Sequence, residues 1–278
     1  MAEDRRPNAG LPLKRDLWLL YVLSSIIALL LAAASLGGLL ARSDFYPTQE
    51  FLQTYLPNDV ISLFIGLPML LGSMLLAKRG KLIGLLLWPG ALIYSLYNDL
   101  IYTLALPLGV AFLLHLVLLM LGLYTLAGLL SSIDAAMVQD RLGGKVRERL
   151  AGGILAGLGT LFFLRALSVV GLALFNQTPL PETDIALNAA DLMVSPAWVV
   201  CGVLLWRRQA FGFVTGLGML FQASMLFIGL IIFMLMQPIL TQAPFSLFDI
   251  AVVFAMGFIC FIPMGLYVRG VLKKHSQG

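Results

Sequence analysis

Charged residues are scarce in this chain of 278 residues, because Lys, Arg, Asp and Glu make up only 12% of it and 60% is hydrophobic. A soluble globular protein carries about 25% charged residues, so the chain lacks the polar surface that a soluble domain of this length needs. The abundance of apolar residues also excludes intrinsic disorder. With a mean hydropathy of +0.96, the composition indicates a polytopic membrane protein.

Cysteine and histidine are rare, with two residues of each type. Cys201 and Cys260 lie inside long apolar runs, which argues against a disulfide framework or a CxxC motif and predicts two small buried hydrophobic residues. The sequence contains no Walker A loop, no HExxH and no GxSxG, and too few histidines for a di-iron centre. We therefore expect no cofactor and no metal ion, and no motif assigns a catalytic residue.

The apolar residues form eight stretches of 18 to 26 residues, separated by charge clusters and turn residues. About 20 helical residues cross a hydrocarbon core, and the stretches lack the alternation of an outer-membrane barrel. We predict an all-α fold, a bundle of about eight transmembrane helices. The predicted spans are Leu17–Ala41, Val60–Ala77, Leu82–Leu106, Leu108–Leu130, Gly152–Phe175, Leu187–Trp206, Phe211–Met236 and Leu247–Val268.

The basic residues fall in alternate connections. All but two of the 18 Lys and Arg lie in the tails or in the connections that an eight-span chain places on one side, and the exceptions are Arg42 and Arg165. The positive-inside rule then predicts a cell-membrane protein with both termini in the cytoplasm. The lipid bilayer explains the basic excess, and no nucleic acid partner is needed. The predicted regions are a cytoplasmic tail 1–16, spans one to four 17–130, a basic cytoplasmic linker 131–150, spans five to eight 151–271 and a tail 272–278. This topology places Pro47, Pro181 and Ala243 outside, and Lys81, Gly144 and Ser276 inside.

The two halves of the chain resemble each other weakly at an offset of 128 residues. The pairs are Pro68 and Pro196, Arg79 and Arg207, Gly84 and Gly212, and Gly90 and Gly218, while Asp59 and Asp191 match after a four-residue slip. Duplication would give two parallel four-helix repeats. A pattern common to membrane edges, with a proline near a span and an arginine after it, would give the same matches without duplication.

Spans three and seven, which correspond in this repeat, both contain helix-weakening residues. Trp88-Pro89-Gly90 predicts a kink in span three, and Gly212, Gly216 and Gly218 weaken span seven. Interrupted helices at equivalent positions point to a transporter's binding site. The alternative, which we favour for Gly212-xxx-Gly216 and Gly153-xxx-Gly157, is ordinary helix packing through small residues.

Ionisable side chains inside spans are costly, so each requires an explanation. Arg165, His115 and Asp99 are expected about 10–15 Å from the outer surface, and Asp59, Asp191 and Asp249 at the outer ends of their spans. On span three, Tyr94, Asn98 and Tyr102 recur every four residues and share one face, with Tyr97 beside them. We predict a polar cavity open to the outside. Its candidate residues are Asp99, Arg165, His115, Tyr94, Asn98, Tyr102, Gln222, Asp191 and Asp59.

Each candidate also has a purely structural explanation. The three aspartates at span ends would cap helices, and the tyrosines would form an interfacial belt. His115 would be a hydrogen-bonded packing residue. Arg165 requires a compensating carboxylate, for which Asp99 is the best candidate by depth, and Asp191 or Asp59 would require the side chain to reach outward.

Two segments, WPGALIYSLYNDLIY (Trp88–Tyr102) and DLMVSPAWVVCGVLLWRRQAFGFV (Asp191–Val214), cover about a seventh of the chain. They resemble stretches of an uncharacterised family of bacterial multi-pass membrane proteins of unknown function. The resemblance implies a topology and no mechanism. It also implies an aromatic residue where this chain has Asp99, which weakens the case for Asp99 as a general functional residue.

The leading functional hypothesis is a permease or binding protein for a small polar solute or ion, with an outward-facing polar cavity. The alternatives are an integral-membrane enzyme that acts on a lipid headgroup at the outer leaflet, and a structural or sensory membrane subunit. Proteoliposome uptake, turnover of a labelled lipid and co-purification of a partner would separate the three. The sequence identifies no protein partner.

Overall fold

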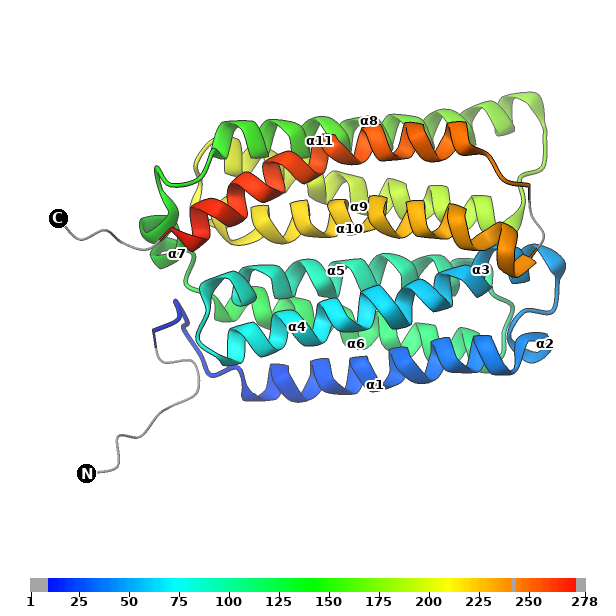
Figure 1. Cartoon of the computed structure of the whole chain (residues 1–278), viewed down its shortest axis with the longest axis horizontal. Helices are drawn as coiled ribbons and strands as arrows, with labels where there is room; N and C mark the ends of the chain where they lie inside the picture. Colours follow the sequence, from blue (N-terminus) through cyan, green and yellow to red (C-terminus); the bar gives the residue numbers. More distant parts are fainter. Residues whose placement is uncertain (1–9, 242–243, 274–278) are drawn as a thin grey trace.

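The computed structural model describes residues 10–241 and 244–273, and the regular elements within them are helices, joined by short connections, with one isolated bridge between Leu13 and Ile133. The predicted all-α bundle is confirmed (Figure 1). The helices are α1 (Trp18–Leu40), α2 (Arg42–Phe45), α3 (Gln49–Ile61), the π-helical η1 (Ser62–Gly66), α4 (Leu67–Lys78), α5 (Leu82–Ala105), α6 (Val110–Ser132), α7 (Ala135–Leu142), α8 (Glu148–Asn176), α9 (Glu182–Trp206), α10 (Ala210–Thr241) and α11 (Leu247–Leu272).

Seven segments of the described chain, rather than eight, are long and apolar enough to cross a membrane. The three elements α3, η1 and α4 count as one of them, running without a break from Gln49 to Lys78. The predicted span that is not among these seven is α5, because Tyr94, Asn98 and Asp99 lower its mean hydropathy. This helix lies lengthwise inside the bundle, in contact with α4, α6, α9 and α10. A helix covered by others contacts little lipid and needs less apolar surface.

Two of the long segments begin earlier than predicted. Thr48 caps α3, since its Oγ1 accepts the Phe51 N–H at 3.2 Å, and α9 begins at Glu182. Asp59 and Asp191 therefore lie about ten residues inside their helices, and the prediction that they cap helix N-termini is wrong. Asp249 does lie in the first turn of α11.

The predicted interruptions are also absent. Helix α5 continues through Pro89 and α10 continues through its glycines, as single helices of 24 and 32 residues. Gly212 instead permits close packing, because a Cβ there would lie 2.3 Å from the Leu205 nitrogen. A Cβ on Gly216 would lie 2.7 Å from the Leu205 side chain. The packing explanation therefore holds for this pair.

The same explanation fails for Gly153 and Gly157, around which a Cβ would meet nothing within 4 Å. Two neighbouring glycines of α8, Gly152 and Gly159, make the close contact with α9 instead. A Cβ on Gly152 would lie 2.5 Å from the Gly202 carbonyl, and one on Gly159 would lie 2.8 Å from the Ser195 carbonyl.

The offset of 128 residues is reproduced in the geometry of two turns. In the α4–α5 turn, the N–H of Arg79 donates to Leu75 and that of Lys81 donates to Leu76. In the α9–α10 turn, Arg207 and Gln209 make the same bonds to Val203 and Leu204. Gly80 and Arg208, the equivalent residues between them, both have positive φ, at 72° and 57°. These matches support the four-plus-four repeat.

The halves meet at equivalent glycines. A Cβ on Gly90 of α5 would collide with the Gly218 carbonyl of α10, and one on Gly218 would lie 3.0 Å from the Gly90 nitrogen. The surrounding contacts are reciprocal, because α3 touches α10 and α9 touches α5. The two halves thus pack against each other through reciprocal contacts, and Figure 1 shows α8 to α11 lying along α1 to α6.

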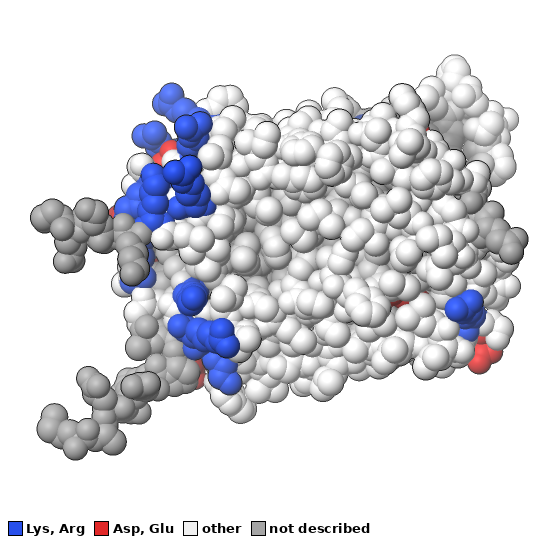
Figure 2. All heavy atoms as spheres, viewed as in Figure 1, with Lys and Arg blue, Asp and Glu red and all other residues white. Residues whose placement is uncertain are grey.

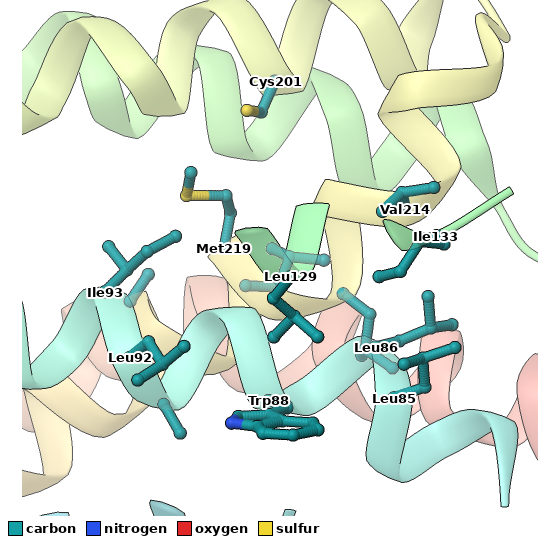
Figure 3. Packing of buried hydrophobic residues seen from close by; sticks show 14 of the residues in the cluster. Leu85, Leu86, Trp88, Leu92, Ile93, Leu129, Ile133, Cys201, Val214 and Met219 are labelled. Atoms are coloured by element: carbon teal, nitrogen blue, oxygen red, sulfur yellow. The ribbon is translucent and has the colours of Figure 1, made fainter. Parts of the chain in front are cut away.

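Apolar side chains fill the seam beside these glycines. Leu86 and Ile93 of α5 belong to the same hydrophobic cluster as Val214 and Met219 of α10 (Figure 3). Trp88 is fully buried beneath them, and its Nε1 donates to Ser24 Oγ of α1 at 3.1 Å. The predicted burial of Cys201 and Cys260 is confirmed, and both are free thiols.

Charge separates the two ends of the bundle. Lys and Arg gather over the end where α1 begins and α11 ends, which we call the basic end (Figure 2). Helix α2, with Arg42 and Asp44, lies at the opposite end, which we call the far end. The predicted linker 131–150 lies at the basic end and contains α7. The predicted tails lie largely outside the described residues, as do Ala243 and Ser276.

Candidate functional site

A cavity of about 540 Å³ lies between α3 and α5 of the first half and α8, α9, α10 and α11 of the second. Along α9 its lining runs from Thr183, in the first turn at the far end, to Trp198, a distance of roughly 20 Å at 1.5 Å per residue. The cavity therefore extends from the far end into the middle of the bundle. Its polar lining includes Thr54, Tyr55, Asn58, Tyr94, Tyr97, Asn98, Arg165, Thr183, Asp184, Asp191, Ser195 and Gln237.

The only cation among these lining residues is Arg165 of α8, and it pairs with Asp191 of α9. Arg165 Nη2 lies 2.6 Å from Asp191 Oδ2, with side-chain exposures of 45% and 7%. Tyr97 of α5 donates its hydroxyl to the other oxygen, Oδ1, at 2.7 Å. The expected pairing of Arg165 with Asp99 is wrong, because the long side chain reaches along the cavity wall to the neighbouring helix.

Asp99 instead pairs with the imidazole of His115 across the α5–α6 contact, at 2.9 Å from Nδ1. Both side chains are buried, with exposures of 2% and 3%, and neither lines the cavity. The His115 ring also stacks on Tyr102, with centroids 4.0 Å apart and planes inclined by 15°. This arrangement matches the expectation of a hydrogen-bonded packing histidine.

A second carboxylate, Asp59, is linked to the cavity through hydrogen bonds. It accepts the hydroxyls of Tyr46, at 2.5 Å, and Tyr102, at 3.0 Å. Asn58 Nδ2, on the cavity wall, donates to the same Tyr102 oxygen at 3.2 Å and to Asn98 Oδ1 at 3.3 Å. Tyr46 lies in the connection before α3, where burial and then the charge of Asp59 raise its pKa well above the usual range. Its hydroxyl therefore stays protonated and donates to the carboxylate.

Aromatic side chains form the inner floor of the cavity. Phe162 lies edge-on to both Trp198 and Phe227, with centroids 5.7 and 6.1 Å apart. Behind the floor, Trp198 Nε1 donates to Gln222 Oε1 at 2.6 Å. Gln222 is thus buried behind the cavity, and its Nε2 has no partner within the described chain.

The structure brings four of the nine predicted site residues to the cavity wall. These are Tyr94, Asn98, Arg165 and Asp191. Tyr102 is one hydrogen bond behind the wall and Asp59 is two, Gln222 is behind the floor, and Asp99 and His115 form a separate pair. The cavity is therefore more apolar than predicted.

Several wall residues escaped the sequence analysis. Asn58 and Thr54 are four residues apart on α3, a spacing that would have placed both on one face, but the predicted span began after them. Tyr55 gives no such signal, although its buried hydroxyl has no partner in the described chain. Trp198, Phe227 and Phe233 look like core residues in the sequence, because apolar floor and apolar core have the same composition.

Comparison with protein-family models, curated proteins and solved structures finds no match to this chain. The resemblance to a bacterial membrane family therefore stays a prediction. Among the described residues, no group of three His, Cys, Asp or Glu side chains is placed to hold a metal ion. The chemistry of the site is read from its geometry alone.

Proposed function

We propose that this integral membrane protein is a binding protein or permease for a small amphipathic solute. The observation that carries the proposal is the composite lining of the cavity. Arg165, Asn58 and Asn98 lie along its middle, and Phe162, Trp198 and Phe227 close its inner end. Its volume of about 540 Å³ lies within the range of about 300–1,000 Å³ typical of ligand pockets.

Two side chains on the cavity wall, Arg165 and Tyr55, have hydrogen-bond donors without a partner in the described chain. Arg165 has five N–H groups and uses one of them, on Asp191. The Tyr55 hydroxyl, buried and without a partner in the described chain, also lines the cavity. An unsatisfied buried donor is costly, so a ligand oxygen there is stabilising. We expect a polar group that accepts hydrogen bonds, attached to an apolar body that fits the aromatic floor.

The enzyme alternative has no comparable support. The imidazole–carboxylate pair of His115 and Asp99 resembles a base with its orienting group. It lies outside the cavity lining, where a solute in the cavity does not reach it. Binding or transport therefore fits the geometry better than catalysis.

The test compares two permanently charged probes with one alkyl chain, octanesulfonate and octyltrimethylammonium, on protein in lipid nanodiscs. We expect octanesulfonate, which accepts hydrogen bonds, to raise the melting temperature, and the ammonium probe, which has no acceptor, to leave it unchanged. Val194→Trp should abolish the rise, because Val194 lines the cavity. The matched control is Val200→Trp on the exposed face of the same helix.

Equal shifts with both probes, or equal shifts in both tryptophan variants, would contradict the proposal. Uptake of labelled octanesulfonate into proteoliposomes then separates a permease from a binding protein, since the permanent anion crosses lipid poorly on its own.

A further inference from the structure

A second pocket lies at the basic end, far from the cavity. It has a volume of about 260 Å³ and lies between the last turns of α11 and the connection from α7 to α8. Four of its six lining residues are cationic: Lys145 and Arg147 from the connection, and Arg269 and Lys273 from α11. Leu266 and Gly270 complete the lining.

Close packing holds the two sides of this pocket together. A Cβ on Gly270 would lie 2.6 Å from the Lys145 carbonyl and 2.7 Å from the Val146 side chain, so the connection lies directly on α11. Tyr267, one turn earlier, is buried and donates its hydroxyl to the Phe213 carbonyl of α10 at 3.1 Å. The backbone on both sides of the pocket is therefore held in place by packing and hydrogen bonds.

The connection itself is hydrogen-bonded. The Gly144 N–H donates to Glu148 Oε1 at 3.1 Å, and the Lys145 N–H donates to the Leu142 carbonyl at 2.9 Å. Glu148 is buried, and its other oxygen lies 3.9 Å from Arg208. Glu148 is not among the residues that line the pocket, and no acidic residue in the described chain lines it.

The like charges of Arg147 and Arg269 at one pocket repel each other, and an anion bound between them removes that repulsion. The pocket lies where α11 passes from exposed apolar residues, such as Ile259 and Ile262, to the basic end of the bundle (Figure 2). This is the level at which phosphate groups of a bilayer lie, and basic pockets between helices there bind anionic headgroups. Leu266 adds an apolar contact at the same place.

We propose that this pocket binds a phosphate group, carried by the headgroup of an anionic phospholipid or by a free phosphate ion. The guanidinium groups of Arg147 and Arg269 match phosphate geometry, because each donates paired N–H groups. The site is independent of the cavity, so either proposal stands or fails without the other.

The test measures binding of dihexanoylphosphatidylglycerol, dihexanoylphosphatidylcholine and inorganic phosphate to the purified protein by native mass spectrometry and thermal shift. The pocket variant is Arg147→Gln with Arg269→Gln. The matched control, Arg79→Gln with Lys81→Gln, removes two cations from the α4–α5 turn at the same end. None of these four side chains makes a hydrogen bond or ion pair in the described chain, so both variants should melt like the wild type without added anion.

We expect the pocket variant to bind phosphatidylglycerol about 25-fold more weakly, since each of the two removed cations contributes about fivefold near an anionic lipid. The affinity of the control variant for phosphatidylglycerol should lie within about twofold of the wild-type affinity. All three proteins should bind phosphatidylcholine equally. If the pocket variant also binds inorganic phosphate more weakly, the phosphate group alone is sufficient for binding. If only its binding of phosphatidylglycerol is weaker, the ligand is the lipid. Equal losses in both variants, or no binding to the wild type, would overturn the proposal.

Discussion

Asp191 is held by side chains from two other helices, since Arg165 reaches it from α8 and Tyr97 from α5. The carboxylate therefore ties the first half of the chain to the second at the cavity wall. Only one of its partners is charged, and that partner is 45% exposed. The ion pair should contribute to stability and also remain open to a ligand.

A double-mutant cycle measures this pair. We expect Arg165→Leu and Asp191→Asn each to lower the stability in nanodiscs, and the double variant to lose less than the sum. Partial exposure of Arg165 places the coupling at about 1–2 kcal/mol, below the about 3–5 kcal/mol of a fully buried pair. The control cycle, Arg165→Leu with Asp99→Asn, should be additive within about 0.5 kcal/mol, because the two residues share no partner. Coupling between Arg165 and Asp99, with none between Arg165 and Asp191, would mean that Arg165 pairs with Asp99 instead.

The sequence predicted which polar residues required partners, but it could not pair them. Depth along a helix placed Arg165 near Asp99, yet depth leaves the rotation of each helix unspecified. Asp99 faces α6 and Asp191 faces α8, and those directions depend on packing across the whole bundle. The aromatic floor was invisible for a related reason, since Trp198 gives the same sequence signal in a cavity wall as in a core.

At the scale of elements, glycines decide how closely the helices approach. Sequence spacing identified Gly212 and Gly216 correctly and chose the wrong pair on α8, where Gly152 and Gly159 make the contact. These two pairs of glycines, Gly153 with Gly157 and Gly152 with Gly159, lie within about two turns, so the choice between them depends on which face meets α9. Span ends failed similarly, because α3 and α9 begin in polar sequence that a hydropathy window excludes.

The crossing of α5 and α10 gives a prediction for single glycines. We expect Gly90→Ala to lower the stability by about 1–3 kcal/mol, the range for overpacking, because the new Cβ collides with the Gly218 carbonyl. Gly157→Ala, in open space on α8, should raise it by about 0.5–1 kcal/mol, because alanine restricts the unfolded chain. Melting curves in nanodiscs check both. A neutral Gly90→Ala would mean that the two helices are not in close contact.

For the whole molecule, the distribution of basic residues predicts the orientation in the membrane. We expect single cysteines at Pro47 and Pro181, both exposed at the far end, to react with an impermeant maleimide in intact cells. Cysteines at Lys81 and Met137, exposed at the basic end, should react only after lysis. Each of these cysteines is introduced into a variant in which Cys201 and Cys260 have been replaced, so that no native thiol reacts. We choose Met137 rather than Gly144, which is also predicted to lie inside, because the φ of +74° at Gly144 disfavours any side chain. Labelling of Lys81→Cys in intact cells would invert the topology.

The contact between Gly90 and Gly218 also has a consequence for the origin of the chain. If the chain arose by duplication of a four-helix unit, two copies that packed through one glycine would produce this seam. The cavity does not share the symmetry, because the position equivalent to Arg165 in the first half is Gly37, where a side chain would strike the ring of Phe45. Among the described residues that line the cavity, Arg165 is the one cation and it lies in the second half, so the two halves differ at the cavity wall although they meet at equivalent glycines.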